Sequence, residues 1–379
     1  MPSTLTVNHR TSALPASARP GTEVTAFHRR LPGFAPTPLR ELPQLATQLG
    51  VGRLLAKDES VRLGLPAFKV LGASWAVYRI LVERLGHEPR WSDLGELGRA
   101  VVAELGPLRL VAATDGNHGR AVAHMARRLG LDATIVVPAG TAAARIEAIA
   151  GEGATVQVVD GTYDDAVAAS AGLASPRDLV VSDTSWPGYE DAPRWVIEGY
   201  ATIFTELQDQ LAALDTVADV VLVPVGVGAL AAAAAAGLRA GSQPGDGPVL
   251  IGVEPSNAAC MAAAVAAGHV VEVPGPHRSI MAGLNCGLAS MLALPVVEAA
   301  YAALVAVDDD VCRRAVRALA DAGLDVGETG AAALAGLLAL VEDHRVEVPL
   351  PATATAVLLI TEGVTDPAGF AEVVGRPPR

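Results

Sequence analysis

Residues 109–123 read RLVAATDGNHGRAVA, in which an apolar run passes through a polar segment with two glycines into an alanine-containing stretch. The run Arg109–Ala113 predicts a buried strand, and the residues from Arg120 onward predict a helix. Open α/β sheets bind ligands at the carboxyl ends of their strands, and glycines on either side of Asn117 and His118 let the backbone approach a ligand closely. An ordinary strand-to-helix turn with an N-cap is the alternative. The segment therefore predicts an α/β sheet with a candidate ligand loop.

The pattern of this segment repeats along the chain from residue 36 onward. Short β-branched runs alternate with alanine-rich stretches, which is typical of a parallel sheet with helices on both faces. The predicted strands are Arg109–Ala113, Ala133–Val137, Thr155–Val159, Val220–Pro224, Leu250–Glu254 and Thr355–Leu359. The predicted helices are Ala73–Leu85, Arg120–Leu129, Ala142–Ala150, Trp195–Leu214, Ala229–Ala240 and Asp309–Ala322. Residues 1–35 show little periodicity, so we expect an extended arm there.

Length and composition limit the fold and the partners. A chain of 379 residues exceeds the roughly 250–300 residues that one hydrophobic core serves, so we expect two lobes. The net charge of −13 provides no basic field for a phosphodiester backbone, so nucleic acid is not expected as a partner. The apolar stretch Val220–Leu238 is interrupted by Pro224, Gly226 and Gly228, so no membrane span is expected. The three cysteines are widely spaced and form no CxxC pair, so neither a disulfide framework nor a zinc site is expected. This cysteine usage is typical of a protein in a reducing cytoplasm.

Lys69 lies in the segment RLGLPAFKVLG (residues 62–72), where Phe68 and Val70 surround one cation near the start of a predicted helix. Burial among apolar side chains lowers the pKa of a lysine amine, and a lysine that forms a Schiff base requires such a lowered pKa. A lysine whose stem snorkels over apolar surface is the alternative. Lys69 taken by itself does not decide between the two.

A second candidate ligand loop follows the predicted strand Val220–Pro224. It reads VGVGA (residues 225–229) and leads into an alanine helix, so its small residues expose the N–H groups of a helix N-terminus, where anions such as phosphate bind. A dinucleotide site is the alternative, because Glu254 follows at about the spacing of the acid that binds a ribose. That fingerprint is a GxGxxG early in the chain, however, and it leaves Lys69 without a role.

The Lys69 segment, the loop of residues 114–120 and the loop of residues 225–229 follow one another along the chain in this order. Together they resemble the tryptophan-synthase-β-like, or fold type II, family of pyridoxal 5'-phosphate (PLP) enzymes. Within it the chain resembles the diaminopropionate ammonia-lyase family, over roughly residues 26–370. Plain threonine dehydratases carry Ser or Thr where this chain has Asp115. The resemblance rests on RLGLPAFKVLGASWA (62–76), ATDGNHGRAVA (113–123), SDTSWPGYE (182–190), PRWVIEGY (193–200), SIMAGLNCG (279–287) and TEGVTDP (361–367).

The resemblance implies a two-lobe α/β fold, with parallel twisted sheets covered by helices and the active site between the lobes. It implies a larger cofactor-binding domain of residues 1–72 and 190–379, and a smaller domain of residues 73–189. PLP is the expected cofactor, and no metal site is expected. The implied cofactor-binding residues are Lys69 as the Schiff-base lysine, Phe68 beside it, Asn117 at the ring oxygen, Gly226, Val227, Gly228 and Ala229 at the phosphate, and Thr361 at the pyridine nitrogen. Glu362 is the alternative neighbour of the pyridine nitrogen.

The catalytic residues implied by the resemblance are Lys69, Asp115 and Asp183. Elimination requires a base at Cα and a proton for the departing amine, and two carboxylates on opposite sides of a substrate can serve opposite enantiomers. The resemblance implies that Asp115 acts on the D form and Asp183 on the L form. An N-cap at Asp115 and a loop-capping carboxylate at Asp183 are the alternatives.

The implied reaction is a PLP-dependent elimination that converts 2,3-diaminopropionate to pyruvate and ammonia, in a cytoplasmic homodimer whose partner is a small amino acid. The alternatives are a serine/threonine dehydratase or another fold type II β-elimination or β-replacement enzyme, and a non-catalytic protein that keeps the cofactor. We assign His118 to packing or phosphate contact rather than catalysis. Trp186 and Tyr189 are interpreted as a lid or as lobe packing, and Cys260 and Cys286 as a redox pair or as buried free thiols.

Overall fold

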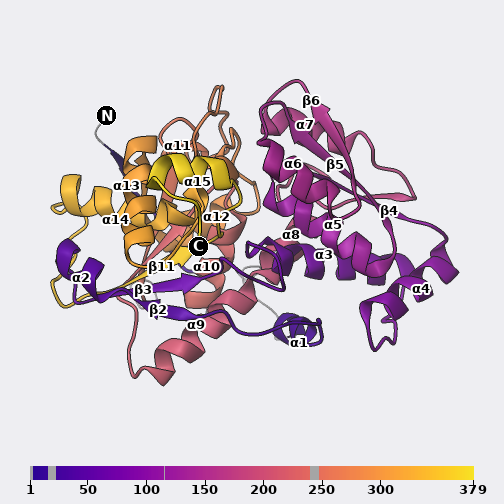
Figure 1. Ribbon diagram of the computed structural model, residues 1–379, viewed down its shortest axis with the longest axis horizontal. Helices are drawn as coiled ribbons and strands as arrows, with labels where there is room; N and C mark the ends of the chain where they lie inside the picture. The colour runs from indigo at the N-terminus through magenta and orange to yellow at the C-terminus, as the bar shows by residue number, and fades with distance from the viewer. Residues whose placement is uncertain (1–2, 16–22, 115, 240–246) are drawn as a thin grey trace. The chain divides into compact units, whose positions relative to one another are not determined.

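The computed structural model describes residues 3–15, 23–114, 116–239 and 247–379. Two compact units make up the chain, unit 1 (Met1–Pro20, Pro36–Val61 and Ile203–Arg379) and unit 2 (Gly21–Ala35 and Arg62–Thr202), and each contains parallel strands and helices (Figure 1). The predicted α/β fold with two lobes is therefore confirmed. The boundaries differ from those predicted, because residues 21–35, 62–72 and 190–202 belong to unit 2. The roles of the units as a larger, cofactor-binding domain and a smaller domain stay predictions.

The described part of unit 1 contains a seven-stranded sheet in the order β1-β10-β9-β8-β11-β3-β2. The central strands run parallel to one another, and the edge strands β1 and β2 pair antiparallel with β10 and β3. β8 and β11 are continuous runs of buried residues, as expected for parallel strands covered on both faces. The strands are β1 (Thr4–Val7), β2 (Leu39–Glu41), β3 (Arg53–Asp58), β8 (Val220–Pro224), β9 (Val249–Pro255), β10 (Tyr301–Val307) and β11 (Thr355–Ile360).

Helices cover this sheet, and α14 makes the most extensive contact with its centre. The helices are α2 (Pro43–Leu49), α9 (Ala201–Ala213, in unit 1 from Ile203), α10 (Ala229–Arg239), α11 (Cys260–Ala267), α12 (Leu294–Ala300), α13 (Asp309–Asp321), α14 (Glu328–Asp343) and α15 (Pro367–Val374). Leu334 and Leu337 of α14 are fully buried, and the helix packs on β8, β9, β10 and β11. Each such leucine stabilises the contact by roughly 1.5–3 kcal/mol. No helix in the described ranges combines the length and the apolar composition needed to cross a bilayer.

Unit 2 contains, in its described residues, a four-stranded all-parallel sheet in the order β6-β5-β4-β7. Its elements are β4 (Arg109–Ala113), β5 (Asp132–Pro138), β6 (Thr155–Val159), β7 (Asp178–Val180), α1 (Glu23–Arg29), α3 (Lys69–Leu85), α4 (Leu94–Leu105), α5 (Asn117–Leu129), α6 (Ala143–Ala150), α7 (Tyr163–Ala171) and α8 (Asp191–Gly199). Helices α3 and α8 meet at two glycines, where a Cβ on Gly199 would lie 2.6 Å from the Gly72 Cα. Only glycine permits this approach. The contact explains why the segments around residues 72 and 199 belong to one unit.

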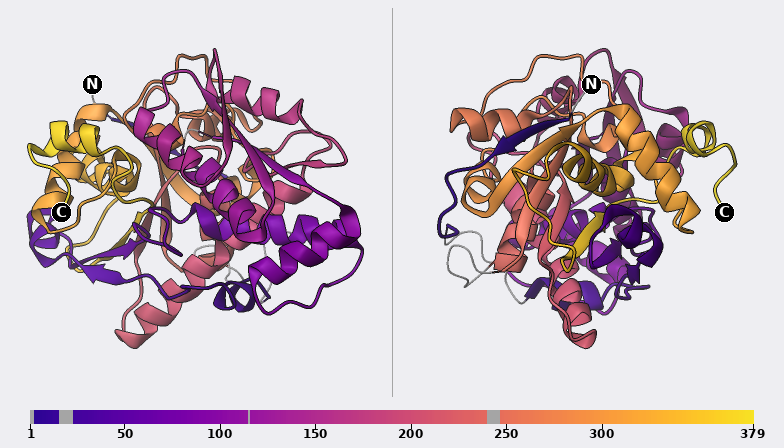
Figure 2. Two further views of the ribbon diagram at one scale, coloured as in Figure 1. Left: turned by 45° about the vertical axis from the view of Figure 1, so that its right-hand side comes forward. Right: turned by 90° about the vertical axis from the view of Figure 1, so that its left-hand side faces the viewer.

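Two parts of the predicted extended arm, Thr4–Val7 and Glu23–Arg29, form a strand and a helix instead. Thr4–Val7 form β1, which pairs with β10 and is the indigo arrow at the sheet edge in the right-hand view of Figure 2. Glu23–Arg29 form α1, whose buried Phe27 packs against the Trp75 ring within unit 2. Both elements are too short to show a periodicity, and tertiary contacts stabilise them. Residues 1–2 and 16–22 of the predicted arm lie outside the described residues.

Unit 1 also contains a fully buried ion pair. Lys57 of β3 has no exposed side-chain surface, and its Nζ donates to Glu206 Oε2 at 2.7 Å. The same ammonium donates to the Thr37 carbonyl at 2.8 Å and to Gln210 Oε1 at 3.1 Å. Each of its three protons therefore has an acceptor, which offsets the cost of removing the charge from water. The network joins the segment before β2 to β3 and α9.

Candidate active site

Lys69 and Asp183, both predicted to be catalytic, lie against each other in unit 2. Lys69 begins α3 and Asp183 follows β7, so the contact joins residues 114 positions apart in the chain. Lys69 Nζ lies 2.6 Å from Asp183 Oδ2, and 20% of the lysine side chain and 5% of the aspartate side chain are exposed. The ammonium also lies 5.5 Å from the centre of the Phe68 ring. The pair is a largely buried charged contact in which the lysine keeps some exposed surface.

The chain has only two lysines, Lys57 and Lys69. Lys57 has no exposed side-chain surface and is paired with Glu206, whereas Lys69 is one-fifth exposed. A reactive amine must be reached by its ligand, so the exposed surface of Lys69 agrees with its predicted role as the Schiff-base lysine. The number of lysines can be read from the sequence. Together with the burial of Lys57, it supports the predicted role of Lys69 independently of any motif.

Asp183 is held as a carboxylate by its surroundings. Burial by itself raises the pKa of a carboxyl group, but the Lys69 ammonium, His118 and the hydrogen bonds from Lys69 and Tyr163 outweigh burial and hold the pKa of Asp183 well below its usual range. Tyr163, the first residue of α7, donates its hydroxyl to Asp183 Oδ1 at 2.8 Å. The capping box at the start of α7 predicts a helix there, but no sequence pattern connects Tyr163 with Asp183.

His118 of α5 is buried and forms a hydrogen bond with the backbone two residues before Asp183. Its Nε2 donates to the Val181 carbonyl at 2.8 Å, and its Nδ1 has no hydrogen-bond partner among the described residues. Burial lowers the pKa of the imidazole, and the charge of Lys69 adds to this effect against an opposing effect of Asp183. The ring is therefore neutral at neutral pH, and its geometry agrees with the packing assignment.

We expect His118 to lower the stability of the fold in acid. Because its folded pKa lies below the value of about 6.5 in an unfolded chain, the unfolded state binds this proton first as the pH falls below about 6.5, and the folded state loses up to about 1.4 kcal/mol per pH unit. His118→Gln keeps a donor for the Val181 carbonyl and removes the titration. Urea unfolding between about pH 5 and 7 should give a shallower pH slope for His118→Gln than for the unsubstituted protein. The exposed His269→Gln is the control, and equal slopes for His118→Gln and the unsubstituted protein would contradict the assignment.

The loop after β4 carries the other residues predicted on this side. Gly116 N donates to Thr114 Oγ1 at 2.8 Å, which closes the turn before α5. Asn117 is the first residue of α5 and is half-buried. Asp115, the second predicted catalytic carboxylate, lies outside the described residues. The roles of Asn117 and Asp115 therefore stay predictions.

Trp186 and Tyr189, interpreted as a lid or as packing, form a small hairpin after β7. Their rings stack at a centroid distance of 4.1 Å, and their backbones exchange two hydrogen bonds. The Tyr189 hydroxyl donates to the Val180 carbonyl at 2.8 Å and accepts from Ser182 N at 3.1 Å. These bonds tether the hairpin to the end of β7 and hold the backbone that carries Asp183.

The glycine loop, defined as residues 225–229, connects β8 to α10 in unit 1. The N–H groups of Val227, Gly228 and Ala229 donate to no other described residue. At a helix N-terminus such groups stand where the helix dipole is positive, and they commonly bind phosphate. The residues predicted to hold a phosphate are thus suited to one, although their role stays a prediction.

Gly228 is required by its neighbours, whereas Gly226 only packs close to one of the cysteines. Gly228 has a φ of +102°, and a Cβ there would lie 2.3 Å from Met261 Cε. A Cβ on Gly226 would lie 3.4 Å from Cys286 Sγ, and Cys260 Sγ lies 3.6 Å from the Gly226 carbonyl oxygen. Both cysteines are buried, belong to no disulfide and border the glycine loop. A side chain at Gly228 would therefore collide with Met261.

Thr361 and Glu254 stand at the carboxyl ends of strands in unit 1. Thr361 follows β11, is buried, and donates its hydroxyl to the Thr329 carbonyl at 3.2 Å. Glu254 of β9 is fully buried, and its two oxygens accept the N–H groups of Met261 and Ala262, each at 2.8 Å. A buried carboxyl group whose two oxygens are both engaged cannot bind a ribose, which removes the support for a dinucleotide site. The predicted role of Thr361 at the pyridine nitrogen stays a prediction.

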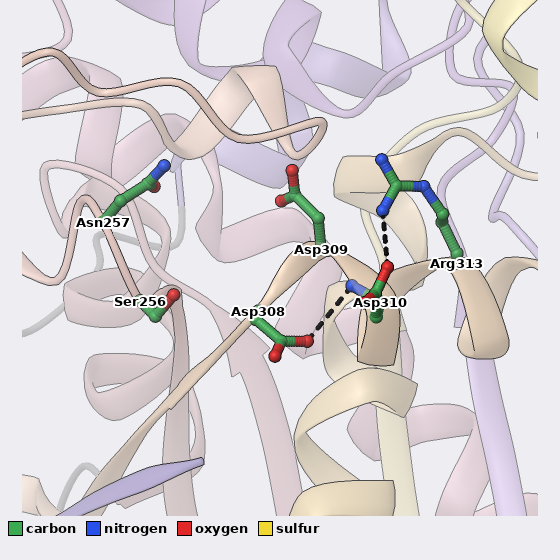
Figure 3. Close-up of a pocket in the computed structure, with 6 residues that line it drawn as sticks. All are labelled: Ser256, Asn257, Asp308, Asp309, Asp310 and Arg313. Carbon is green, nitrogen blue, oxygen red and sulfur yellow. Dashed lines mark hydrogen bonds and ion pairs between the residues drawn. The ribbon is translucent and has the colours of Figure 1, made fainter. Parts of the chain in front are cut away.

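Unit 1 also has a polar pocket of about 280 Å³ at the start of α13, lined by Ser256, Asn257, Asp308, Asp309, Asp310 and Arg313 (Figure 3). Its carboxylates already have partners. Asp308 caps the first turn of α13, Asp309 accepts from Ser279 Oγ at 2.6 Å, and Asp310 pairs with Arg313 at 2.7 Å. No group of three or more His, Cys, Asp or Glu side chains in the described ranges is arranged to hold a metal ion. The pocket contains none of the predicted site residues.

Sequence comparison with known proteins points to one cofactor chemistry. The family model described as pyridoxal-phosphate dependent enzyme matches residues 30–362, which include every predicted site residue. The diaminopropionate ammonia-lyase of Salmonella typhimurium is 35% identical over 370 residues, covering 93% of this chain and 91% of that protein. A biosynthetic L-threonine dehydratase of Escherichia coli is 29% identical over 238 residues, covering 63% of this chain and 39% of that protein.

Solved structures give the same result. The diaminopropionate ammonia lyase of Escherichia coli, crystallised with an aminoacrylate-PLP azomethine reaction intermediate, superposes with a TM-score of 0.88 at 31% identity, covering 98% of this chain and 96% of that one. A maize serine racemase, at 21% identity and a TM-score of 0.73, covers 94% of this chain and 96% of that one and shares the fold alone. The similarity thus extends over nearly the whole of both units.

Proposed function

This chain belongs to the diaminopropionate ammonia-lyases within the family of pyridoxal-phosphate-dependent enzymes, and on that premise we propose that it converts 2,3-diaminopropionate to pyruvate and two molecules of ammonia. The contact of Lys69 Nζ with Asp183 Oδ2 at 2.6 Å carries the proposal. An enzyme that attaches a cofactor to a lysine and removes a proton from Cα needs an amine and a base in one place. The contact supports this pair of roles.

The described residues suit PLP. Lys69 would hold the cofactor covalently with Phe68 beside it, Asn117 would contact the ring oxygen, the glycine loop would bind the phosphate, and Thr361 would face the pyridine nitrogen. When bound, PLP supplies an electron sink that makes the Cα proton of an amino acid acidic. These assignments and the location of the active site between the lobes stay predictions.

Asp183 and Lys69 supply the proton transfers in this proposal. The positive charge of Lys69 is the largest of the effects that lower the pKa of Asp183, so loss of that charge raises the pKa and makes the carboxylate a stronger base. Tyr163 engages Oδ1 of Asp183, which leaves Oδ2, now bonded to Lys69, to receive a substrate proton when the lysine moves away. We propose Asp183 as the base for the L enantiomer and Asp115 as the base for the D enantiomer.

Product analysis tests the function directly. The PLP-loaded protein is incubated with L- and D-2,3-diaminopropionate, L-serine and L-threonine, and keto acid and ammonia are both measured. Diaminopropionate should give two ammonia molecules per pyruvate, whereas serine or threonine gives one per keto acid. The 29% identity to a threonine dehydratase makes dehydration of serine or threonine the second candidate. Turnover of serine or threonine without turnover of diaminopropionate would favour it, and cofactor binding without any keto acid would favour a non-catalytic protein.

We further propose a cytoplasmic homodimer that acts on a small amino acid. An acidic sequence with a pI near 5.1, and three cysteines that belong to no disulfide, are compatible with a reducing compartment. Light scattering coupled to size-exclusion chromatography measures the mass in solution against the 38.6 kDa of one chain. A monomeric mass would contradict the dimer.

Gly228→Asp is expected to weaken PLP binding by at least about tenfold, because a carboxylate at a helix N-terminus repels a phosphate dianion. The new Cβ also meets Met261 Cε, in a backbone conformation with φ of +102° that favours glycine. Equilibrium dialysis of PLP measures the dissociation constant. Gly375→Asp is the matched control, because its φ is +82° and nothing lies within 4 Å of a Cβ there. An unchanged dissociation constant for Gly228→Asp would mean that the phosphate binds elsewhere.

A further inference from the structure

Glu254 is a buried acid that the proposed reaction does not use. It stands in β9, whose neighbours in the sheet are β8 and β10, and its side chain has no exposed surface. No lysine, arginine or histidine of the described residues lies within ion-pair distance of its carboxylate. Its two oxygens instead accept backbone N–H groups, Oε1 from Met261 and Oε2 from Ala262, each at 2.8 Å.

Such a position is unfavourable for a carboxyl group. Burial raises the pKa of Glu254 to about 8, although the two backbone N–H groups oppose this effect. An apolar residue of similar volume would avoid the desolvation. The two hydrogen bonds are therefore the feature of Glu254 that an apolar residue could not replace.

The N–H groups that Glu254 accepts belong to the first turn of α11. The residue at the N-cap of this helix is Ala259, whose methyl side chain cannot accept a hydrogen bond from the N–H groups of the first turn. The first N–H groups of a helix lack partners within the helix, and Ser, Thr, Asp or Asn at the N-cap ordinarily accepts them. Glu254 performs this role from the neighbouring strand and thereby fixes the position of α11 relative to β9.

The same turn of α11 forms a wall of the glycine loop. The Cys260 thiol lies 3.6 Å from the carbonyl oxygen of Gly226, and Met261 Cε lies 2.3 Å from the position that a Cβ on Gly228 would take. Two consecutive residues of the turn that Glu254 caps thus contact both glycines of the loop. A displacement of this turn would move the loop or open a void beside it.

We propose that Glu254 is a positioning residue for the cofactor phosphate, which holds the first turn of α11 against Gly226 and Gly228 and so orients the N–H groups of the glycine loop. The proposal rests on the proposed function, because it assumes that this loop binds the phosphate of PLP. Glu254 itself touches no cofactor atom in this proposal. Replacing Glu254 should therefore weaken the part of the PLP affinity that comes from the phosphate group. It should leave the reactivity of Lys69 unchanged.

Glu254→Gln tests the proposal, because the amide keeps one acceptor oxygen and turns an NH₂ group toward the other backbone N–H. Binding of PLP and of pyridoxal, which lacks the phosphate, is measured on the full chain. We expect the PLP dissociation constant to rise at least about tenfold, equal to about 1.4 kcal/mol, with the pyridoxal constant unchanged. The ³¹P chemical shift of bound PLP should move as well. Glu254→Asp, which withdraws the carboxylate by one methylene, serves if the amide variant does not fold.

Glu206→Gln is the matched control, since it changes another buried glutamate of unit 1 that bonds Lys57 and not the glycine loop. It should lower stability without altering the ratio of PLP to pyridoxal affinity. An unchanged ratio and an unchanged ³¹P shift in Glu254→Gln would overturn the proposal. If the unsubstituted protein itself binds PLP no more tightly than pyridoxal, the phosphate assignment of the glycine loop fails instead, so the two failures are distinguishable.

Discussion

Replacing Lys69 by alanine is expected to lower the turnover of 2,3-diaminopropionate by about 10³-fold or more, the scale seen when a covalent or acid–base catalyst is removed. Of the two lysines, the substitution removes the one whose amine a cofactor can reach, because Lys57 is fully buried against Glu206. It also leaves the Asp183 carboxylate without the ammonium that lies 2.6 Å away. Removing one partner of a buried ion pair costs about 3–5 kcal/mol, so Lys69→Ala should also be less stable.

Lys69→Arg separates these two effects. Arginine keeps a cation beside Asp183 but has no amine that can attach covalently to the PLP aldehyde, so this variant should keep the stability and lose the activity. Borohydride reduction of the loaded protein followed by peptide mapping identifies the attachment site. Label on Lys57, or on the N-terminal amine, would refute the assignment of Lys69.

Asp183→Asn is expected to lower turnover of the L enantiomer by about 10²-fold or more, with a much smaller effect on the D enantiomer, as for the loss of a general base. A base must lie within about 2.6–3.2 Å of the group whose proton it removes, so one fixed carboxylate reaches only one face of a planar substrate. The hydrogen bond from Tyr163 holds Oδ1 of the buried Asp183 in place after Lys69 moves away, which limits the carboxylate to one face. The measurement is the ratio of kcat/KM for the two enantiomers.

Asp115→Asn should show the reverse preference, with a loss of about 10²-fold or more for the D enantiomer. Asp178→Asn is the matched control, because Asp178 belongs to the same strand that leads to Asp183 but forms a partly exposed pair with Arg109. It should keep both activities. Equal losses for both enantiomers in both active-site variants would exclude the two-base model and favour a shared base such as Lys69.

Several strands could be predicted residue for residue. The predicted strands Arg109–Ala113, Thr155–Val159 and Val220–Pro224 have the same bounds as β4, β6 and β8. Each is a short apolar or β-branched run that ends at residues with turn or helix-start signals, so both its type and its ends are local properties. The helix predicted to end at Ala240 ends at Arg239 in the described residues, and Ala240 lies outside them.

Other elements depended on contacts that no local pattern reveals. The predicted helix Trp195–Leu214 is divided into α8 and α9 at Tyr200, which is fully buried and packs edge-on against the Phe68 ring at 4.7 Å. The strand Tyr301–Val307 was not predicted, because its alanine-rich sequence resembles the helix that precedes it. Pairing with β9 and with the short edge strand β1 stabilises it as a strand.

The sequence by itself determined which groups are present and which chemistry they permit. A lysine among apolar residues at the start of a helix, and small residues at a helix N-terminus after a buried strand, are local features, and both were found from the sequence. Only the tertiary structure decided the partners of these groups. It brought Asp183 to Lys69 across 114 positions, supplied Tyr163 and made Glu254 a cap for α11. The physical reason is that a pKa and an orientation depend on burial and on neighbouring charges, and these come from segments far apart in the chain.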